Sequence, residues 1–100
     1  MSEAYEHKDG ANLFKGIEAV GGKLYLTKEA LIHRPHKFNI QSRETVIELK
    51  DITEVVTRNT LLVIPNGLLV KTTGGNKYKL VVFDRDNWIE KINLFRHGWN

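Results

Sequence analysis

The chain has 100 residues, 41% of them hydrophobic, and a formal net charge of +3. This is the length of one domain, and the absence of cysteine excludes a disulfide framework, a thiolate nucleophile and a cysteine metal site. The polar segment 1–10 excludes a signal peptide of the usual kind, and the longest apolar run, Leu61–Ile64, is too short to span a bilayer. We therefore expect residues 1–11 to form a flexible terminus and residues 12–100 to form one cytoplasmic domain.

Positive charge is concentrated in two blocks of the sequence. Residues 13–43 hold six Lys or Arg and two acids, and residues 59–83 hold three Lys and no acid. A β fold could bring these blocks together into one basic surface, although a solvated, mildly basic exterior would have the same composition.

Turn residues divide the first part of the chain into short strands. Leu24 and Leu26 alternate with polar neighbours, which is the period of a strand with one buried face. Glycine pairs favour turns because they tolerate positive φ. We predict these strands and turns in chain order: Leu13–Val20, a turn at Gly21-Gly22, Lys23–Thr27, a turn at Lys28-Glu29, and Ala30–Arg34.

The same alternation continues in the second half. Ile47 and Leu49 mark a further strand, and the Asn66-Gly67 pair predicts a tight hairpin. The expected elements are a strand Leu61–Ile64, the turn Asn66-Gly67, a strand Leu68–Thr73, a turn Gly74–Asn76, and a strand Lys77–Phe83. About seven strands result, the number expected of a sandwich or barrel.

The period changes after Phe83. Trp88, Ile92 and Phe95 fall on one helical face, beside Ile89, and Asp84 or Asp86 can cap the start. Gly98 is a plausible stop. A single amphipathic helix must bury this face against the strands. The predicted fold class is all-β (α+β by count), a seven-stranded barrel or sandwich capped by one C-terminal helix.

Several segments resemble the GRAM branch of the pleckstrin-homology-like superfold. They are Gly22–Thr27, Leu31-Ile32, Phe38-Asn39, Ile47 and Leu49 followed by Ile52, Val55 and Val56, then Pro65–Val70, Val81–Phe83, Arg85-Asp86 and Trp88-Ile89. The resemblance implies seven strands with a capping helix, and a small stand-alone, bacterial module that binds membrane lipid or protein without catalytic residues. Fold alone does not establish function. Phosphoinositide-binding pleckstrin-homology domains usually carry several cations in the first hairpin loop, whereas Gly21-Gly22 is followed only by Lys23.

The segment from Ile32 to Arg43 is the candidate binding loop. Cations there could contact anionic headgroups or an acidic partner while an aromatic side chain enters the interface. The primary site residues are Arg34, Lys37, Phe38 and Arg43. By analogy with the fold, the turns at Gly21-Gly22 and Gly74–Asn76 lie at the same end, so Lys23 and Lys77 are secondary site residues. The expected partner is a protein, bound by this loop or by an exposed strand edge, or an anionic membrane surface reached peripherally from inside the cell.

Other kinds of site have weaker support in the sequence. His33 and His36 flank Pro35 without a nearby cysteine or acid, so we expect no metal and no cofactor. Serines and threonines lack a nucleophile-elbow context, which argues against an enzyme. A basic patch with Tyr25, Phe38 and Tyr78 leaves single-stranded nucleic acid as the alternative ligand. The sequence does not determine the oligomeric state.

Overall fold

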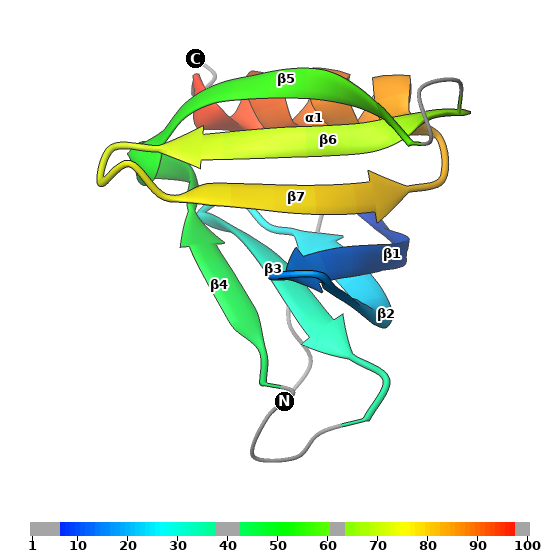
Figure 1. Ribbon diagram of the computed structural model, residues 1–100. Coiled ribbons are helices and arrows are strands. Elements are labelled where there is room, and N and C mark those ends of the chain that lie inside the picture. The colour runs from blue at the N-terminus through cyan, green and yellow to red at the C-terminus, as the bar shows by residue number, and fades with distance from the viewer. Residues whose placement is uncertain (1–6, 38–42, 61–63, 98–100) are drawn as a thin grey trace.

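The computed structural model describes residues 7–37, 43–60 and 64–97 and contains one sheet and one long helix (Figure 1). The elements in chain order are β1 (His7–Lys15), β2 (Glu18–Leu26), β3 (Ala30–Pro35), β4 (Thr45–Glu48), the 3₁₀ turn η1 (Leu49–Asp51), β5 (Ile52–Thr60), β6 (Ile64–Thr72), β7 (Lys77–Val82) and α1 (Arg85–Arg96). No helix among the described residues is long and apolar enough to cross a membrane.

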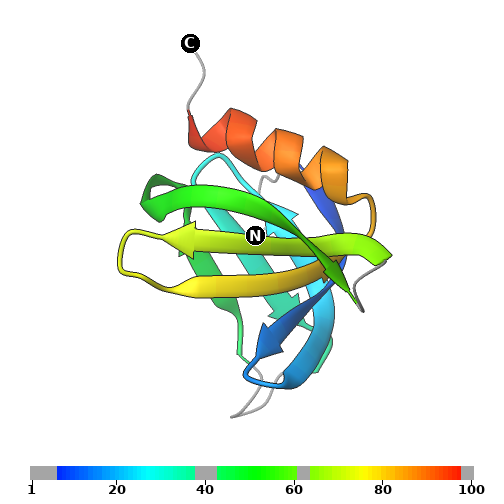
Figure 2. The same cartoon turned by 45° about the horizontal axis from the view of Figure 1, so that its top comes forward.

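The seven strands form a single antiparallel sheet in the order β4-β3-β2-β1-β7-β6-β5. β1 joins the two halves of the sheet, because it pairs with β2 along its whole length and with β7 from Ala11 to Leu13. The sheet curls into a half-barrel, and α1 lies across its open side (Figures 1 and 2). The predicted class, a seven-stranded β domain with one C-terminal helix, is confirmed.

The helix completes the core in the way that its period predicts. Trp88 and Ile92 are fully buried and Phe95 nearly so, and the helix packs against β5, β6 and η1. Asp84 occupies the N-cap position with a left-handed backbone (φ 61°), and its carbonyl accepts a hydrogen bond from the Trp88 amide. Its side chain makes no capping hydrogen bond, and the predicted stop at Gly98 lies outside the described residues.

The predicted turn at Gly21-Gly22 is wrong, because both residues lie inside β2. The chain reverses at Gly16-Ile17 instead, with Lys15 paired to Glu18 and Gly16 at φ 64°. A Cβ atom on Gly22 would lie 2.1 Å from the Arg34 carbonyl oxygen. Glycine is required there because the β3 backbone approaches closely.

The turn predicted at Asn66-Gly67 is also wrong, because both residues lie within β6. β5 and β6 already pair at Thr60 and Ile64, so the chain reverses before Asn66. The predicted strand Leu61–Ile64 falls mostly on residues outside the described part. The turns at Lys28-Glu29 and Gly74–Asn76 are confirmed. The domain was expected to start at Asn12, whereas β1 begins at His7.

Candidate binding surfaces

The β1–β2 hairpin and the residues flanking the β3–β4 connection lie at one end of the molecule, which we call the hairpin end (Lys15, Ile17, Glu18, Lys37, Arg43 and Glu44). Lys15 Nζ donates a 3.4 Å hydrogen bond to the Arg43 carbonyl and so ties the hairpin to the start of β4. Ile17 forms the tip of the hairpin and is 101% exposed. A shallow hollow of about 300 Å³ separates residues 18–21 from residues 35–37.

Two of the predicted primary residues lie at this end, and a third pairs with an acid of the same end. Lys37 and Arg43 are exposed on the two sides of the β3–β4 connection. Arg34 forms an ion pair with Glu44, and its guanidinium lies over the Tyr25 ring at 5.0 Å. The charge of Arg34 is therefore partly offset within the protein. Phe38 lies outside the described residues.

The secondary residues do not join the hairpin end. Lys23 is exposed in the middle of β2, in register with Arg34 on β3. Lys77 begins β7 opposite Lys71, next to a turn whose Thr73 amide donates to the Asp51 carbonyl. Both views show this turn apart from the end of β3 (Figures 1 and 2). The structure does not gather the five predicted residues that it describes into a single patch.

Lys15 and Ile17 are binding candidates that the sequence interpretation missed. Placing the turn at Gly21-Gly22 put both residues inside a strand. One signal was available: Val20, Leu24 and Leu26 keep one alternating register straight through Gly22. Continuous alternation across a glycine pair indicates one strand rather than two.

His33 and His36 occupy different environments. His33 is buried on β3, and its Nε2 lies 3.0 Å from the Ala11 carbonyl oxygen. Burial lowers the pKa of His33, helped by the positive charges of Lys15 and His36, while the hydrogen bond to Ala11 opposes this. His36 is exposed, and its amide donates to the Gly21 carbonyl. Within the described residues, no three His, Asp or Glu side chains are grouped to hold a metal ion.

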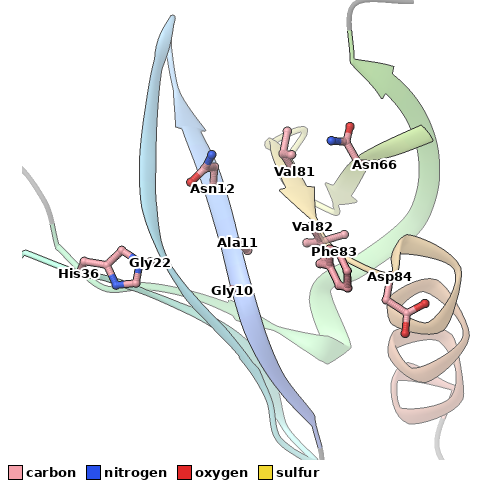
Figure 3. Close-up of a pocket in the computed structure, with 10 residues that line it drawn as sticks. All are labelled: Gly10, Ala11, Asn12, Gly22, His36, Asn66, Val81, Val82, Phe83 and Asp84. Carbon is pink, nitrogen blue, oxygen red and sulfur yellow. The ribbon is translucent and has the colours of Figure 1, made fainter. Parts of the chain in front are cut away.

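A larger hollow crosses the outer surface of the sheet, which we call the cross-strand groove (Gly10, Asn12, Gly22, His36, Val81 and Phe83). Its volume is about 580 Å³, and residues of β1, β2, β6 and β7 line it. In Figure 3, Asn12 on β1 lies between His36 on one side and Val81 and Phe83 on the other. Phe83 is 78% exposed at the end of β7, and Asp84 follows it at the rim.

Comparison with known structures shows the fold. The crystal structure of the C-terminal domain of an unknown protein from Leishmania infantum is 16% identical, with a TM-score of 0.82 over 95% of this chain and 85% of that chain. The linker-DH/PH domains of p115-RhoGEF are 18% identical, with a TM-score of 0.71 over 96% of this chain. A DH/PH mutant of the same protein is 18% identical, with a TM-score of 0.68 over 96% of this chain.

This chain spans 30% and 31% of the two p115-RhoGEF structures, so the likeness concerns one domain of a larger protein. At these identities the likeness shows the fold alone. No curated protein sequence matches this chain.

The family is shown by a sequence model. The model of the GRAM domain matches residues 5–93, which is most of the chain. GRAM and pleckstrin-homology-like domains generally serve as binding modules for lipids or proteins. With its seven-stranded half-barrel, its capping helix and this match, the chain belongs to the GRAM domain family.

Proposed function

We propose that this protein is a non-catalytic module that attaches peripherally to an anionic membrane surface, on the cytoplasmic side, through its hairpin end. The observation that carries the proposal is Ile17, which is 101% exposed at the tip of the hairpin whose Lys15 donates a hydrogen bond to the Arg43 carbonyl. An apolar side chain that projects among cations can enter the interfacial region of a bilayer while the charges meet the headgroups. The family supports binding of lipid or protein as the broader class.

The charges of this end are compatible with weak electrostatic attachment. The cations of this end are Lys15, Lys37, Arg43 and Arg34, and the nearby acids are Glu18 and Glu44, of which Glu44 pairs with Arg34. Each cation near an anionic surface contributes about 1 kcal/mol, and burial of an isoleucine side chain adds about 2 kcal/mol. We therefore expect reversible binding that weakens as salt screens the charges. A stereospecific inositide site is not part of the proposal, because the hairpin tip offers Gly16 and Ile17 rather than a cation cluster.

Co-sedimentation with vesicles tests this proposal. Vesicles of phosphatidylcholine alone and of phosphatidylcholine with phosphatidylserine are compared at low and at physiological salt. The parent should pellet with the anionic vesicles, more at low salt. Ile17→Ser should lower the apparent affinity about thirtyfold, the equivalent of about 2 kcal/mol. The double charge reversal Lys37→Glu/Arg43→Glu should abolish the preference for anionic vesicles.

Matched controls lie away from the hairpin end. Lys28→Glu/Lys50→Glu makes the same charge change beyond the far end of β2, roughly 26 Å away along that nine-residue strand. Leu94→Ser removes another exposed aliphatic side chain, from α1. Both controls should bind as the parent does. Equal binding of Ile17→Ser and the parent, or an equal loss in the controls, would contradict the proposal.

The sequence left two other ligand classes open, a protein partner and single-stranded nucleic acid, and they are not equally well supported. Binding of a protein partner is supported by a separate surface and is argued below. Binding of single-stranded nucleic acid stays a prediction with less support, because cations already lie over the Phe14 and Tyr25 rings on the outer face of the sheet. The bacterial origin and the stand-alone character implied by the family resemblance also stay predictions.

A further inference from the structure

The outer face of the three central strands is basic. Strand alternation points Leu13 and Leu24 into the core and their neighbours outward. The charged side chains at the outward positions of β2, β1 and β7 are all lysines, with no Asp or Glu among these described positions: Lys8, Lys23, Lys77 and Lys79. A positively charged face attracts an acidic partner during diffusion and also stabilises it once it is bound.

A furrow crosses this face because small residues stand in register. Asn12 pairs with Gly21 on β2 and with Val81 on β7, and Val81 pairs with Gly67 on β6. The two glycines add no side chain to this row, and the Asn12 side-chain oxygen and the His36 ring lie beside Gly21. Gly10 and Lys23 form the row on one side, and Phe14 with Lys79 lies on the other. Asn12 and Val81 of this row line the cross-strand groove, together with the neighbouring Gly10, Gly22 and Asn66 (Figure 3).

The length of the furrow indicates the size of its occupant. Four strands at about 4.8 Å spacing give roughly 14 Å from β2 to β6, which is the reach of about four or five extended residues at 3.3 Å each. Val81 and the exposed ring of Phe83 provide an apolar place within it. Lys23 and Lys79 flank the furrow on opposite sides.

The aromatic side chains of this face favour a peptide over single-stranded nucleic acid. Lys79 Nζ lies over the Phe14 ring at 5.4 Å, and Arg34 lies over the Tyr25 ring at 5.0 Å. One face of each ring is thus already covered, whereas single-strand binding stacks successive bases on open rings.

We propose that the cross-strand groove binds a short, extended, acidic segment of a partner protein, seating one bulky apolar side chain beside Val81 and Phe83 while its carboxylates pair with Lys23 and Lys79. This surface is separate from the hairpin end, so the proposal does not depend on membrane binding. With both surfaces in use, the protein would hold an acidic partner segment at a membrane.

The test is a titration of the ¹⁵N-labelled protein with the peptide Asp-Glu-Trp-Glu-Asp, followed by amide chemical shifts at low and physiological salt. Shifts should concentrate on the amides of Gly10, Asn12, Gly21 and Phe83. Two variants, Lys23→Glu/Lys79→Glu and Phe83→Ser, should each raise the dissociation constant about tenfold or more. Lys28→Glu/Lys50→Glu and Leu94→Ser change exposed residues away from the groove and should leave the dissociation constant within twofold.

The outcomes are decisive because the variants replace exposed side chains, and the amide spectrum itself reports that they fold. No saturable shift at millimolar peptide, or shifts centred on another surface, would overturn the proposal. So would equal binding of Lys-Lys-Trp-Lys-Lys, which keeps the apolar anchor and reverses the charge. An oligothymidylate that binds this face more tightly than the acidic peptide would replace a protein segment with nucleic acid.

Discussion

His33 combines deep burial with an incomplete set of hydrogen bonds. Its Nε2 lies 3.0 Å from the Ala11 carbonyl oxygen, so Nε2 carries the proton and donates. Nδ1 is buried and has no hydrogen-bond partner among the residues that the structure describes. Protonation of Nδ1 would place a charge in an apolar interior near Lys15 and His36. The neutral ring is therefore the form that the native protein stabilises.

We predict that the free energy of unfolding falls as the pH drops through the histidine range. The pKa of His33 is lowered in the folded protein, while the unfolded chain keeps a value of about 6.5. The unfolded state thus binds more protons below about pH 6.5, and the contribution of neutral His33 is present above that pH and lost below it. Urea unfolding midpoints between pH 8 and pH 5 measure this slope.

The matched variants separate His33 from other titrating groups. In His33→Gln, the amide can still donate to the Ala11 carbonyl, but the titrating ring is gone, so the slope should be shallower. His36→Gln alters the exposed neighbour and should retain most of the slope. An identical slope in the parent and in His33→Gln would show that other groups cause the acid sensitivity.

Among the secondary structure elements, α1 buries one face and leaves the opposite face exposed. Ile92 is fully buried in the main core, whereas Leu94, two positions along, is 45% exposed. Two residues correspond to about 200° around a helix, which places these side chains on nearly opposite sides. The structural role of the Trp88 face follows directly from the helical period.

Because α1 buries only one face, we predict that two similar truncations on it will change the free energy of unfolding by very different amounts. Ile92→Ala should lower the free energy of unfolding by about 2–5 kcal/mol, because it leaves a cavity in a packed core. Leu94→Ala should change it by less than about 1 kcal/mol. Chemical denaturation of the two variants measures the difference. Similar losses in both would mean that Leu94 is covered in solution, for instance by a second molecule.

A glycine pair forms a turn at one place in this chain and continues a strand at another. Gly74 and Gly75 form a turn, closed by the Gly75 amide donating to the Thr72 carbonyl. Gly21 and Gly22 continue a strand, because Arg34 of β3 leaves no room for a side chain at Gly22. Both places carry a glycine pair, and what separates them is the approach of β3 at Gly22 together with the strand alternation that continues through it.

The whole molecule places its two candidate surfaces on different parts of the half-barrel. The hairpin end lies beyond the ends of β1, β2 and β3, whereas the cross-strand groove crosses the outer face of the sheet. His36 lies between the two hollows and lines both. The modest net charge of +3 is therefore less informative than the distribution of the lysines.

We expect the two surfaces to bind independently at physiological salt, where the Debye length is about 8 Å. Ile17→Ser should leave the dissociation constant for the acidic peptide within twofold, and Lys79→Glu should leave vesicle binding nearly unchanged. Residues without shared contacts generally contribute additively. Peptide titration and vesicle sedimentation of each variant measure this. Competition between the peptide and anionic vesicles for the parent protein would indicate a single shared surface instead.

The sequence by itself determined the secondary structure class, most strands, the buried helix face and the family resemblance. Those features depend on the side-chain period and on local backbone preference, and both are written in consecutive residues. Lys37 and Arg43 could be proposed as a pair for the same reason, since one short connection carries them.

The tertiary structure decided the register of the strands and hence the surfaces. It placed the first hairpin at Gly16-Ile17, brought Lys15 to Arg43, engaged Arg34 with Glu44, and separated Lys77 from the hairpin end. It also aligned Gly21, Asn12, Val81 and Gly67 into one row. Pairing between strands distant in sequence depends on the packing of the whole core, so no local pattern of residues contains it.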